Sequence, residues 1–178
     1  MKKAIKLTPR LQSVFDEIPS GKALWDICCD HGYLGRKALH EGFEKVHFVD
    51  PVEGLMLRLQ DELISEGFQV VEDSRWYKRF VLGEQVVHWH CCKGEDIPIQ
   101  ELEGTISIIG VGARTIQKML EAWKAGMLRN EAIERILCGP HTEIEKFEGF
   151  LSDYPMKTKK HWKVLEKKRE RLFYNLGS

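Results

Sequence analysis

The sequence of 178 residues lacks several features that would assign it to a class of protein at once. No apolar run approaches the roughly 20 residues of a membrane-spanning helix, which excludes that class. Internal repeats, low-complexity segments and long linkers are absent as well. A chain of this length without a linker predicts one globular domain over residues 1–178.

An excess of one charge and a secretion signal are also missing. The sequence has 27 basic and 27 acidic residues, so no global positive field is available for nucleic-acid binding. The first six residues, Met1 to Lys6, carry positive charge, but no long apolar stretch follows them. This pattern argues against a signal peptide and favours a cytoplasmic location.

Five cysteines are present, but none belongs to a C-x-x-C pair, the usual signature of a structural zinc site. An odd number of cysteines without a secretion signal predicts reduced thiols. Cys28–Cys29 and Cys91–Cys92 are adjacent pairs, and neighbouring residues of a strand point to opposite faces. At most one member of each pair can face a given site, so no metal site is expected.

Short apolar runs alternate with amphipathic stretches along most of the chain. Strands are predicted at residues 23–29, 46–49, 85–92, 105–111 and 133–138. Helices are predicted at residues 9–18, 33–41, from about 53, 115–127 and 142–151. This alternation predicts an α/β fold with a mostly parallel sheet and helices on both faces.

Two segments depart from that alternation. Residues 162–165 and 172–176 have almost nothing between them, which predicts a C-terminal antiparallel hairpin. The stretch from Gly67 to Gly83 is the least regular, and we interpret residues 68–71 as a short strand and residues 76–82 as an extension of a helix. His88, Trp89 and His90 alternate along a strand, and we expect them to pack under helices.

The unusual residues of the chain concentrate where predicted strands end, and ligands of open α/β sheets bind beyond those carboxyl ends. The loop from Asp26 to Tyr33 contains neither the G-x-G-x-x-G nor the G-x-x-x-x-G-K-[ST] pattern, which disfavours a diphosphate cofactor. An acidic loop suits a positively charged group. Asp50 ends the second strand, where a carboxylate commonly binds ribose hydroxyls, and Glu95 and Asp96 can accept from an exocyclic amine.

Together these residues describe a nucleoside with a positively charged tail, which is the outline of S-adenosylmethionine. Two motifs point further. Leu7-Thr-Pro-Arg-Leu-Gln-Ser-Val, with Ile18-Pro19-x-Gly21 after it, is similar to the opening helix and turn of one bacterial family. Asp26-x-x-x-Asp30-His31-x-Tyr33-Leu34 resembles that family's cofactor loop, D-I-G-S-D-H-A-Y-L.

Three later motifs continue the resemblance in the same order. Asp50-Pro51-x-Glu53-Gly54 is similar to E-V-N-E-G-P, Ile109-Gly110-x-Gly112 to A-G-M-G-G, and Leu137-x-Gly139-Pro140-His141 to L-Q-P-N. On these residues the chain resembles the bacterial family that methylates N1 of adenine 22 in tRNA. The resemblance covers nearly the whole chain, and its most specific motif is the Asp-His-x-Tyr-Leu loop.

The resemblance implies a Rossmann-like class I methyltransferase fold and S-adenosyl-L-methionine as the cofactor. Because N1 of adenine attacks without losing a proton, the site must align the reactants and stabilise a cationic ring. We assign that stabilisation to Asp30. His31 either orients Asp30 or contacts the base, and Tyr33 stacks on the base. The residues expected to bind the cofactor are Asp26, Cys28, Asp30, Asp50, Pro51, Glu95, Asp96, Gly110 and Gly112.

The chain departs from the family's pattern at several positions. Cys28 and Cys29 replace small residues of the cofactor loop, Ala113 replaces the usual second glycine, and His141 replaces an asparagine. The family also has a C-terminal helical extension implicated in holding tRNA, whereas the present sequence ends at Ser178, directly after the predicted hairpin.

The strongest local charge lies in the segment from Lys157 to Arg171, where eight basic and two acidic residues give a net charge of +6. This segment is either a solvated face or a patch that contacts RNA phosphates, with Lys157, Lys159, Lys160 and Lys163 as candidate contacts to tRNA.

Structural roles remain open for several candidate residues, and three functions remain open for the chain. The structural alternatives are that Asp26 anchors its loop, that His31 is solvated, that Tyr33 packs in the core, and that Gly110 and Gly112 only allow close packing. The first function is methyl transfer to RNA, the second is methyl transfer to a non-RNA substrate, and the third is a non-catalytic cofactor-binding or scaffold domain.

Overall fold

The computed structural model describes residues 5–20 and 23–177. Gly21, which the sequence assigns to the turn after the first helix, lies outside the described residues. The helices are α1 (Pro9–Phe15), α2 (Tyr33–His40), α3 (Glu53–Ser65), α4 (Ala113–Met127) and α5 (Ile144–Ser152), with the 3₁₀ turns η1 (Gly94–Asp96) and η2 (Ile99–Glu101). The strands are β1 (Leu24–Ile27), β2 (Lys45–Val49), β3 (Gln69–Asp73), β4 (Tyr77–Leu82), β5 (Gln85–His90), β6 (Gly104–Ile109), β7 (Ile133–Gly139), β8 (Lys157–Glu166) and β9 (Arg169–Gly177).

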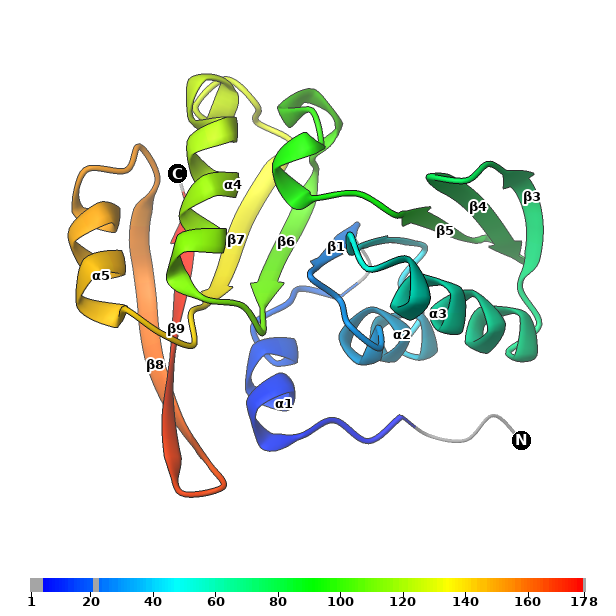
Figure 1. Cartoon of the computed structure of the whole chain (residues 1–178), viewed down its shortest axis with the longest axis horizontal. Helices are drawn as coiled ribbons and strands as arrows, with labels where there is room; N and C mark the ends of the chain where they lie inside the picture. Colours follow the sequence, from blue (N-terminus) through cyan, green and yellow to red (C-terminus); the bar gives the residue numbers. More distant parts are fainter. Residues whose placement is uncertain (1–4, 21–22, 178) are drawn as a thin grey trace.

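The strands form one nine-stranded sheet in the order β3-β4-β5-β2-β1-β6-β7-β9-β8. The five central strands, from β5 to β7, are mutually parallel, which confirms the predicted βαβ organisation. Two antiparallel strands extend the sheet on each side, so only the centre is parallel and the prediction of a mostly parallel sheet was too broad. The sheet twists strongly from one edge to the other (Figure 1).

The segment that the sequence left least regular forms the outer hairpin of the sheet. Residues 68–71 overlap β3, as expected, but residues 76–82 form β4 and not a helical extension. Phe80 is completely buried, whereas its neighbours Arg79 and Val81 remain partly exposed. The strand pairs with β5 in antiparallel register from Tyr77–His90 to Leu82–Gln85, and this pairing outweighs any local preference for helix.

The first helix begins as the sequence predicts. The Thr8 side chain accepts a hydrogen bond from the backbone N–H of Leu11, and Pro9 occupies the first turn. The helix ends at Phe15, earlier than the predicted Ile18. α1 contacts β8 of the C-terminal hairpin, so a helix from the start of the chain packs against a strand from its last third.

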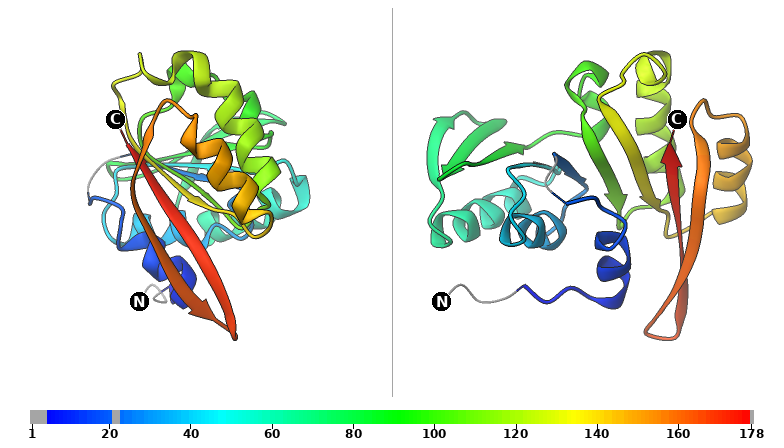
Figure 2. Two further views of the ribbon diagram at one scale, coloured as in Figure 1. Left: turned by 90° about the vertical axis from the view of Figure 1, so that its left-hand side faces the viewer. Right: turned by 180° about the vertical axis from the view of Figure 1, so that it is seen from behind.

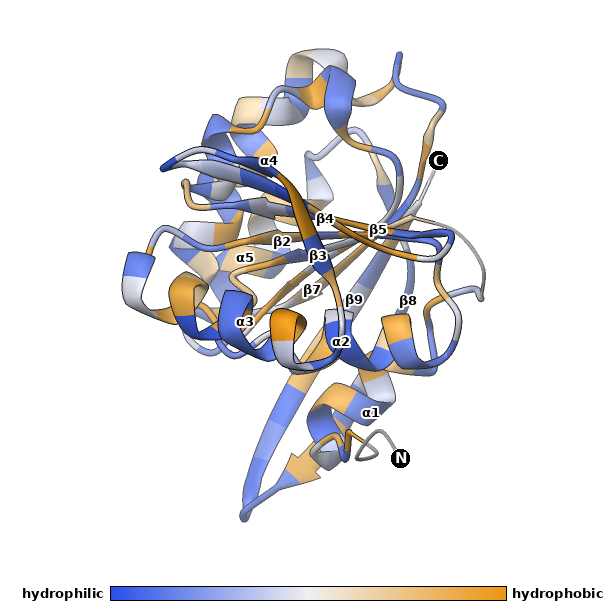
Figure 3. Ribbon diagram, turned by 90° about the vertical axis from the view of Figure 1, so that its right-hand side faces the viewer, coloured by the Kyte–Doolittle hydropathy of each residue, from blue (hydrophilic) through white to orange (hydrophobic). Residues whose placement is uncertain are grey.

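Helices cover both faces of the sheet, with α4 on one side and α2 and α3 on the other (Figure 3). Two core clusters correspond to these faces: one contains Phe48 and Trp89 beneath α2 and α3, and the other contains Trp25 and Trp123 beside α4. The Trp89 indole donates a hydrogen bond of 2.7 Å to the carbonyl of Met56 in α3, so this residue packs under a helix as expected.

His88 and His90 lie on the opposite face of β5 from Trp89. His88 stacks on His47 at 4.3 Å between ring centroids, and His47 stacks on Trp25 at 3.7 Å. His90 contacts His47 through a ring-nitrogen distance of 3.2 Å. These histidines pack in a row of rings across the sheet, on the face opposite to the one where Trp89 packs under α3.

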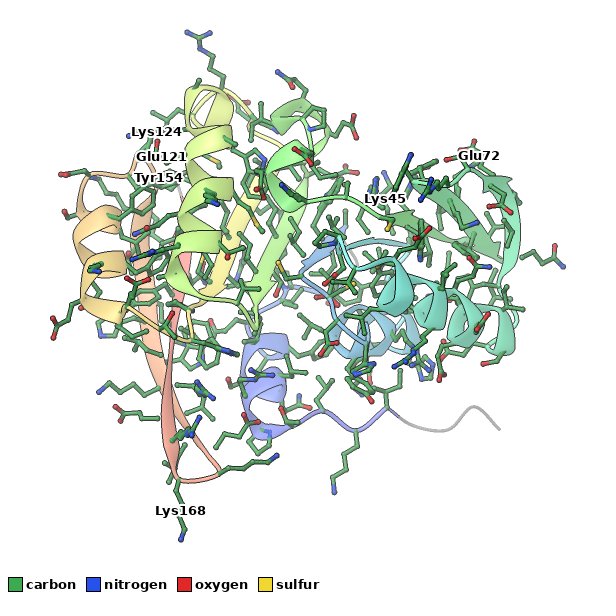
Figure 4. The ribbon with its side chains drawn as sticks, in the orientation of Figure 1. Lys45, Glu72, Glu121, Lys124, Tyr154 and Lys168 are labelled. Atoms are coloured by element: carbon green, nitrogen blue, oxygen red, sulfur yellow. The ribbon has the colours of Figure 1, made fainter. Side chains whose placement is uncertain are left out.

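The predicted C-terminal hairpin is confirmed and is longer than expected. β8 and β9 pair in antiparallel fashion from Lys157–Gly177 to Glu166–Arg169. The far end of the hairpin projects beyond the sheet and past α1 (Figure 2). Lys168, in the turn at its tip, points into solvent (Figure 4). Within residues 5–20 and 23–177, no helix is long and apolar enough to cross a membrane.

Two glycines in helices provide a test of the packing between α2 and the sheet. A Cβ at Gly35 in α2 would lie 2.3 Å from the Phe48 ring, whereas a Cβ at Gly54 in α3 has nothing within 4 Å. We expect Gly35→Ala to lower the free energy of unfolding by about 1–3 kcal/mol, because the buried ring cannot move without disturbing the core. Urea denaturation measures this change.

The matched control is Gly54→Ala, which we expect to leave stability unchanged or to raise it by up to about 1 kcal/mol, because alanine favours helix. Equal effects of the two substitutions would contradict the packing described for α2.

Candidate functional site

A cavity of about 370 Å³ lies at the carboxyl ends of β1, β2 and β6, with α1 along one side. Its lining residues are Thr8, Arg10, Leu11, Asp26, Cys28, Cys29, Asp30, His31, Tyr33, Leu34, Asp50, Ile109, Gly110, Val111 and His141. The sequence predicted a site at this edge of the sheet. A larger hollow of about 480 Å³ lies beside η2 and α4, but no acidic residue lines it and it is near the amino ends of β6 and β7.

The loop after β1 has an unusual backbone that shapes the cavity. Cys28, Asp30 and Gly32 have positive φ angles of 60°, 51° and 65°. Non-glycine residues rarely adopt this conformation unless the surroundings enforce it. The N–H groups of Cys28 and Cys29 donate to the carbonyl of Val49 at 2.8 and 3.3 Å, which fixes the loop against the end of β2.

Asp50 connects the β1 loop to the start of α3. Its Oδ1 accepts a hydrogen bond of 2.9 Å from the N–H of Val52, and its Oδ2 accepts one of 3.4 Å from the N–H of Asp30. Burial raises the pKa of this carboxyl, and the two backbone N–H groups oppose that shift. The carboxylate lines the cavity, as its predicted role at the ribose requires.

Asp26 anchors the loop through a different contact. Its Oδ2 accepts a hydrogen bond of 2.9 Å from the N–H of Gly35 in α2. Burial raises the pKa of Asp26 to about 7, and the charges of Asp50 and Asp30 contribute further in the same direction. The structure thus gives Asp26 the anchoring role that the sequence left open and also places it in the cavity lining.

The three residues predicted to act on the substrate lie together at the rim. The Nε2 atom of His31 is 3.6 Å from Oδ1 of Asp30, and both side chains are substantially exposed. The rings of His31 and Tyr33 lie 5.7 Å apart. Tyr33 is 47% exposed, so its predicted alternative role as a core residue was wrong, and its ring is available for stacking.

Cys28, one of the two cysteines of the cavity wall, is a poor nucleophile. Burial and the neighbouring charges of Asp50, Asp26 and Glu95 raise the pKa of Cys28 to about 12. The thiol therefore stays protonated at neutral pH. Among the residues that the structure describes, no group of three or more histidine, cysteine or acidic side chains is arranged to hold a metal ion.

The two candidate glycines after β6 have different surroundings. Gly110 has a φ of +96° and open space around the position of a Cβ, so it permits a left-handed turn and does not serve close packing. A Cβ at Gly112 would lie 3.0 Å from the Thr142 hydroxyl, consistent with a packing role.

The structure thus brings seven of the predicted site residues into the cavity lining, and four others lie outside it. The seven are Asp26, Cys28, Asp30, His31, Tyr33, Asp50 and Gly110. The four are Pro51, Glu95, Asp96 and Gly112; of these, Glu95 and Asp96 form part of the turn η1 that follows β5.

Arg10 and His141 line the same cavity, although neither was assigned a role from the sequence. The Arg10 guanidinium contacts Nε2 of His141 at 2.8 Å. The Nε atom of Arg10 also lies 3.7 Å from the carboxylate of Glu166 at the end of β8. Both residues belonged to motifs that the sequence singled out, but only the packing of α1 against the hairpin shows that they meet.

The cavity therefore separates opposite charges. Asp26, Asp30 and Asp50 supply carboxylates from the ends of β1 and β2, and Arg10 supplies a guanidinium from α1. A positively charged group complements the carboxylates at one end of this arrangement.

Part of the basic C-terminal segment is already neutralised by neighbouring acids. Lys160 pairs with Glu17, which lies just after the end of α1, and Lys163 pairs with Glu170 across the hairpin. Lys157 and Lys159 are exposed on the same strand.

Comparisons with known proteins agree with this geometry. The chain is similar in fold to Streptococcus pneumoniae Sp1610 in complex with S-adenosyl-L-methionine, with 19% identity and a TM-score of 0.77 over 97% of this chain and 73% of that chain. It is similar to the Bacillus subtilis M1A22 tRNA methyltransferase TrmK, with 20% identity and a TM-score of 0.76 over 98% and 67% of the two chains.

A third similar structure is Mycoplasma capricolum TrmK with the cofactor product S-adenosyl-homocysteine, at 16% identity and a TM-score of 0.71 over 96% and 68% of the two chains. At these identities the likeness establishes the fold. No curated protein matches the sequence. Residues 7–173, however, match the family model described as a methyltransferase domain, and the chain belongs to that family.

Proposed function

We propose that this protein transfers the methyl group of S-adenosylmethionine to RNA, with N1 of an adenine in tRNA as the acceptor. The observation that carries the proposal is the cavity at the carboxyl ends of β1 and β2, where three carboxylates face one guanidinium. Membership of the methyltransferase family and the described function of the similar TrmK proteins support the same reaction.

The residues present fit the cofactor. Asp50 suits the ribose hydroxyls, because a carboxylate at the end of a second parallel strand accepts from both of them. Asp26 keeps an Oδ1 atom with no described hydrogen-bond partner, and this atom suits an ammonium group. The cofactor supplies an activated methyl group on a sulfonium. Pro51 and Asp96 are exposed and lie outside the cavity lining. Their predicted contacts with the cofactor are therefore proposals.

The substrate residues act mainly by positioning and by electrostatics. N1 of adenine has a lone pair, so no general base is required. Tyr33 provides an exposed ring against which a base that has left its stack can lie. As N1 becomes methylated, the ring gains positive charge, and the carboxylate of Asp30 at the rim stabilises that charge. His31 holds the Asp30 side chain in place.

The exposed lysines of the hairpin support contact with RNA phosphates. Lys157 and Lys159 are exposed on β8, at the end of the hairpin where Lys157 pairs with Gly177 and lies beside α5. A methyltransferase that acts on a small molecule has no need of such a surface. The ion pairs of Lys160 and Lys163 reduce their expected contribution.

The raised pKa of Asp26 predicts a pH dependence of cofactor binding. A cationic cofactor favours the ionised carboxylate, so binding near pH 6 should release a proton from Asp26. The affinity for S-adenosylmethionine should therefore fall as the pH drops below about 7, by up to tenfold per pH unit. Calorimetric titrations between pH 5.5 and 8.5 measure this dependence.

The variant Asp26→Asn should bind more weakly at pH 8 and lose most of the pH dependence, whereas Asp61→Asn on the exposed face of α3 should behave as the wild type. A pH dependence that survives in Asp26→Asn would assign it to another group.

Methylation of an unmodified tRNA transcript tests the proposed reaction and its residues. We expect Asp30→Asn to lower kcat by roughly 100-fold, because the developing charge on the base loses its counter-charge. Tyr33→Ala should raise KM by roughly tenfold or more through lost stacking, and Tyr33→Phe, the matched control, should stay close to the wild type.

A folded wild-type protein that binds the cofactor but methylates no tRNA would overturn the RNA proposal and leave the non-RNA methyltransferase as the better account. Full activity of Asp30→Asn would remove Asp30 from the mechanism.

The hairpin lysines are tested through the salt dependence of tRNA binding. The double substitution Lys157→Ala and Lys159→Ala should weaken binding and reduce the slope of log affinity against log salt by about two, because two phosphate contacts are lost. The control is Lys118→Ala with Lys124→Ala, two exposed lysines of α4. Equal slopes for the two double variants would show that the hairpin is a solvated face.

A further inference from the structure

His141 has an interaction that fixes the position of its ring proton. The guanidinium of Arg10 has only donors, so its contact of 2.8 Å requires Nε2 of His141 to be the acceptor. A neutral imidazole with a lone pair on Nε2 has its proton on Nδ1. Burial and the charges of Arg10 and Arg171 lower the pKa of His141, which favours this neutral form.

The position of the His141 ring is fixed as well. The backbone N–H of His141 donates a hydrogen bond of 3.0 Å to the carbonyl of Val111. Arg10, which contacts the ring, also interacts with Glu166 at 3.7 Å. The ring lines the cavity, and no described residue hydrogen-bonds to its Nδ1 atom. The residue therefore offers an N–H donor without a protein partner at the cavity.

The place of His141 in the sheet separates it from the cofactor end of the cavity. Asp50 follows β2, and His141 follows β7, with β1 and β6 between these two strands. Three strand spacings correspond to about 14 Å. With the ribose at Asp50, His141 lies at the opposite end, where the methyl acceptor must enter.

We propose that His141 is a substrate-binding residue whose Nδ1–H donates a hydrogen bond to an acceptor atom of the target base. This inference rests on the proposed function. On an adenine methylated at N1, the remaining ring acceptors are N7 and N3, so His141 selects a purine through one of these nitrogens. Arg10 is the positioning residue that keeps the proton of His141 on Nδ1.

Two substitutions separate the donor from the contact with Arg10. Asn places its amide nitrogen close to the position of Nδ1, so His141→Asn keeps the donor and loses the partner of Arg10. Gln extends its amide to the position of Nε2, so His141→Gln keeps an acceptor for Arg10 and loses the donor. Neither substitution is expected to change the affinity for S-adenosylmethionine more than about threefold.

The substrates are tRNA transcripts that contain adenosine, 7-deazaadenosine or 3-deazaadenosine at the methylated position. The wild type should lose about tenfold in kcat/KM on one of the two analogues, because one hydrogen-bond acceptor is missing. His141→Gln should lose about tenfold on the normal transcript and show no further loss on that analogue. His141→Asn should retain the discrimination between the transcripts.

The proposal would be overturned if His141→Gln kept the wild-type kcat/KM on the normal transcript. It would also be overturned if this variant lost as much kcat/KM on the analogue as the wild type does. The tautomer is tested separately by ¹⁵N NMR of the imidazole in the cofactor-bound protein, where a proton on Nε2 would overturn the proposal whatever the substrate is. An Nδ1–H tautomer in a protein that methylates no tRNA would instead overturn the proposed function, together with the base contact that rests on it.

Discussion

The hydrogen bonds between the β1 loop and the end of β2 determine the geometry of the whole candidate site. The carbonyl of Val49 and the carboxylate of Asp50 together accept from three successive N–H groups, those of Cys28, Cys29 and Asp30. These contacts hold two non-glycine residues at positive φ, a conformation that is costly without support. The loop then places Asp30 and the residues after it at the rim, while Asp50 remains inside the cavity. The same carboxylate that binds the loop is therefore the one best placed for a ribose.

The distribution of charge explains how one small cavity can serve two ligands. Carboxylates crowd the ends of β1 and β2, and burial, with a smaller contribution from their mutual repulsion, raises the pKa of Asp26. A cation that enters relieves this repulsion, which favours a cofactor with positive charge. At the other end, Arg10 and His141 present donors. The fold keeps these ends apart because β1 and β6 separate the strands that bear Asp50 and His141. The acidic end suits the cofactor, and the donor end suits a neutral base that becomes cationic only on methylation.

Local patterns predicted most of the fold, and long-range packing decided the rest. The first helix, the buried parallel strands and the hairpin were each visible in residue spacing, and the strand ends correctly located Asp26, Asp30 and Asp50. The strand β4 was misinterpreted because Trp76 to Leu82 is short, and its conformation is decided by pairing with β5 and not by a local pattern. Arg10 was missed because its contact with His141 spans 131 positions of sequence and depends on how α1 docks against the hairpin. Glu95 and Asp96 were predicted from the end of the strand before them; they lie in the turn η1 and not among the residues that line the cavity, and their contact with the cofactor stays a prediction.

The central claim is that the cavity around Asp50 binds S-adenosylmethionine, and a calorimetric titration of the purified protein tests it most directly. The account predicts saturable binding with a stoichiometry of one, weakened at least tenfold by Asp50→Ala, because the ribose loses its acceptor while the loss of the Asp30 contact also loosens the loop. Circular dichroism would confirm that the variant is folded. Absence of binding by the folded wild type, or equal affinities of the two proteins, would contradict the account.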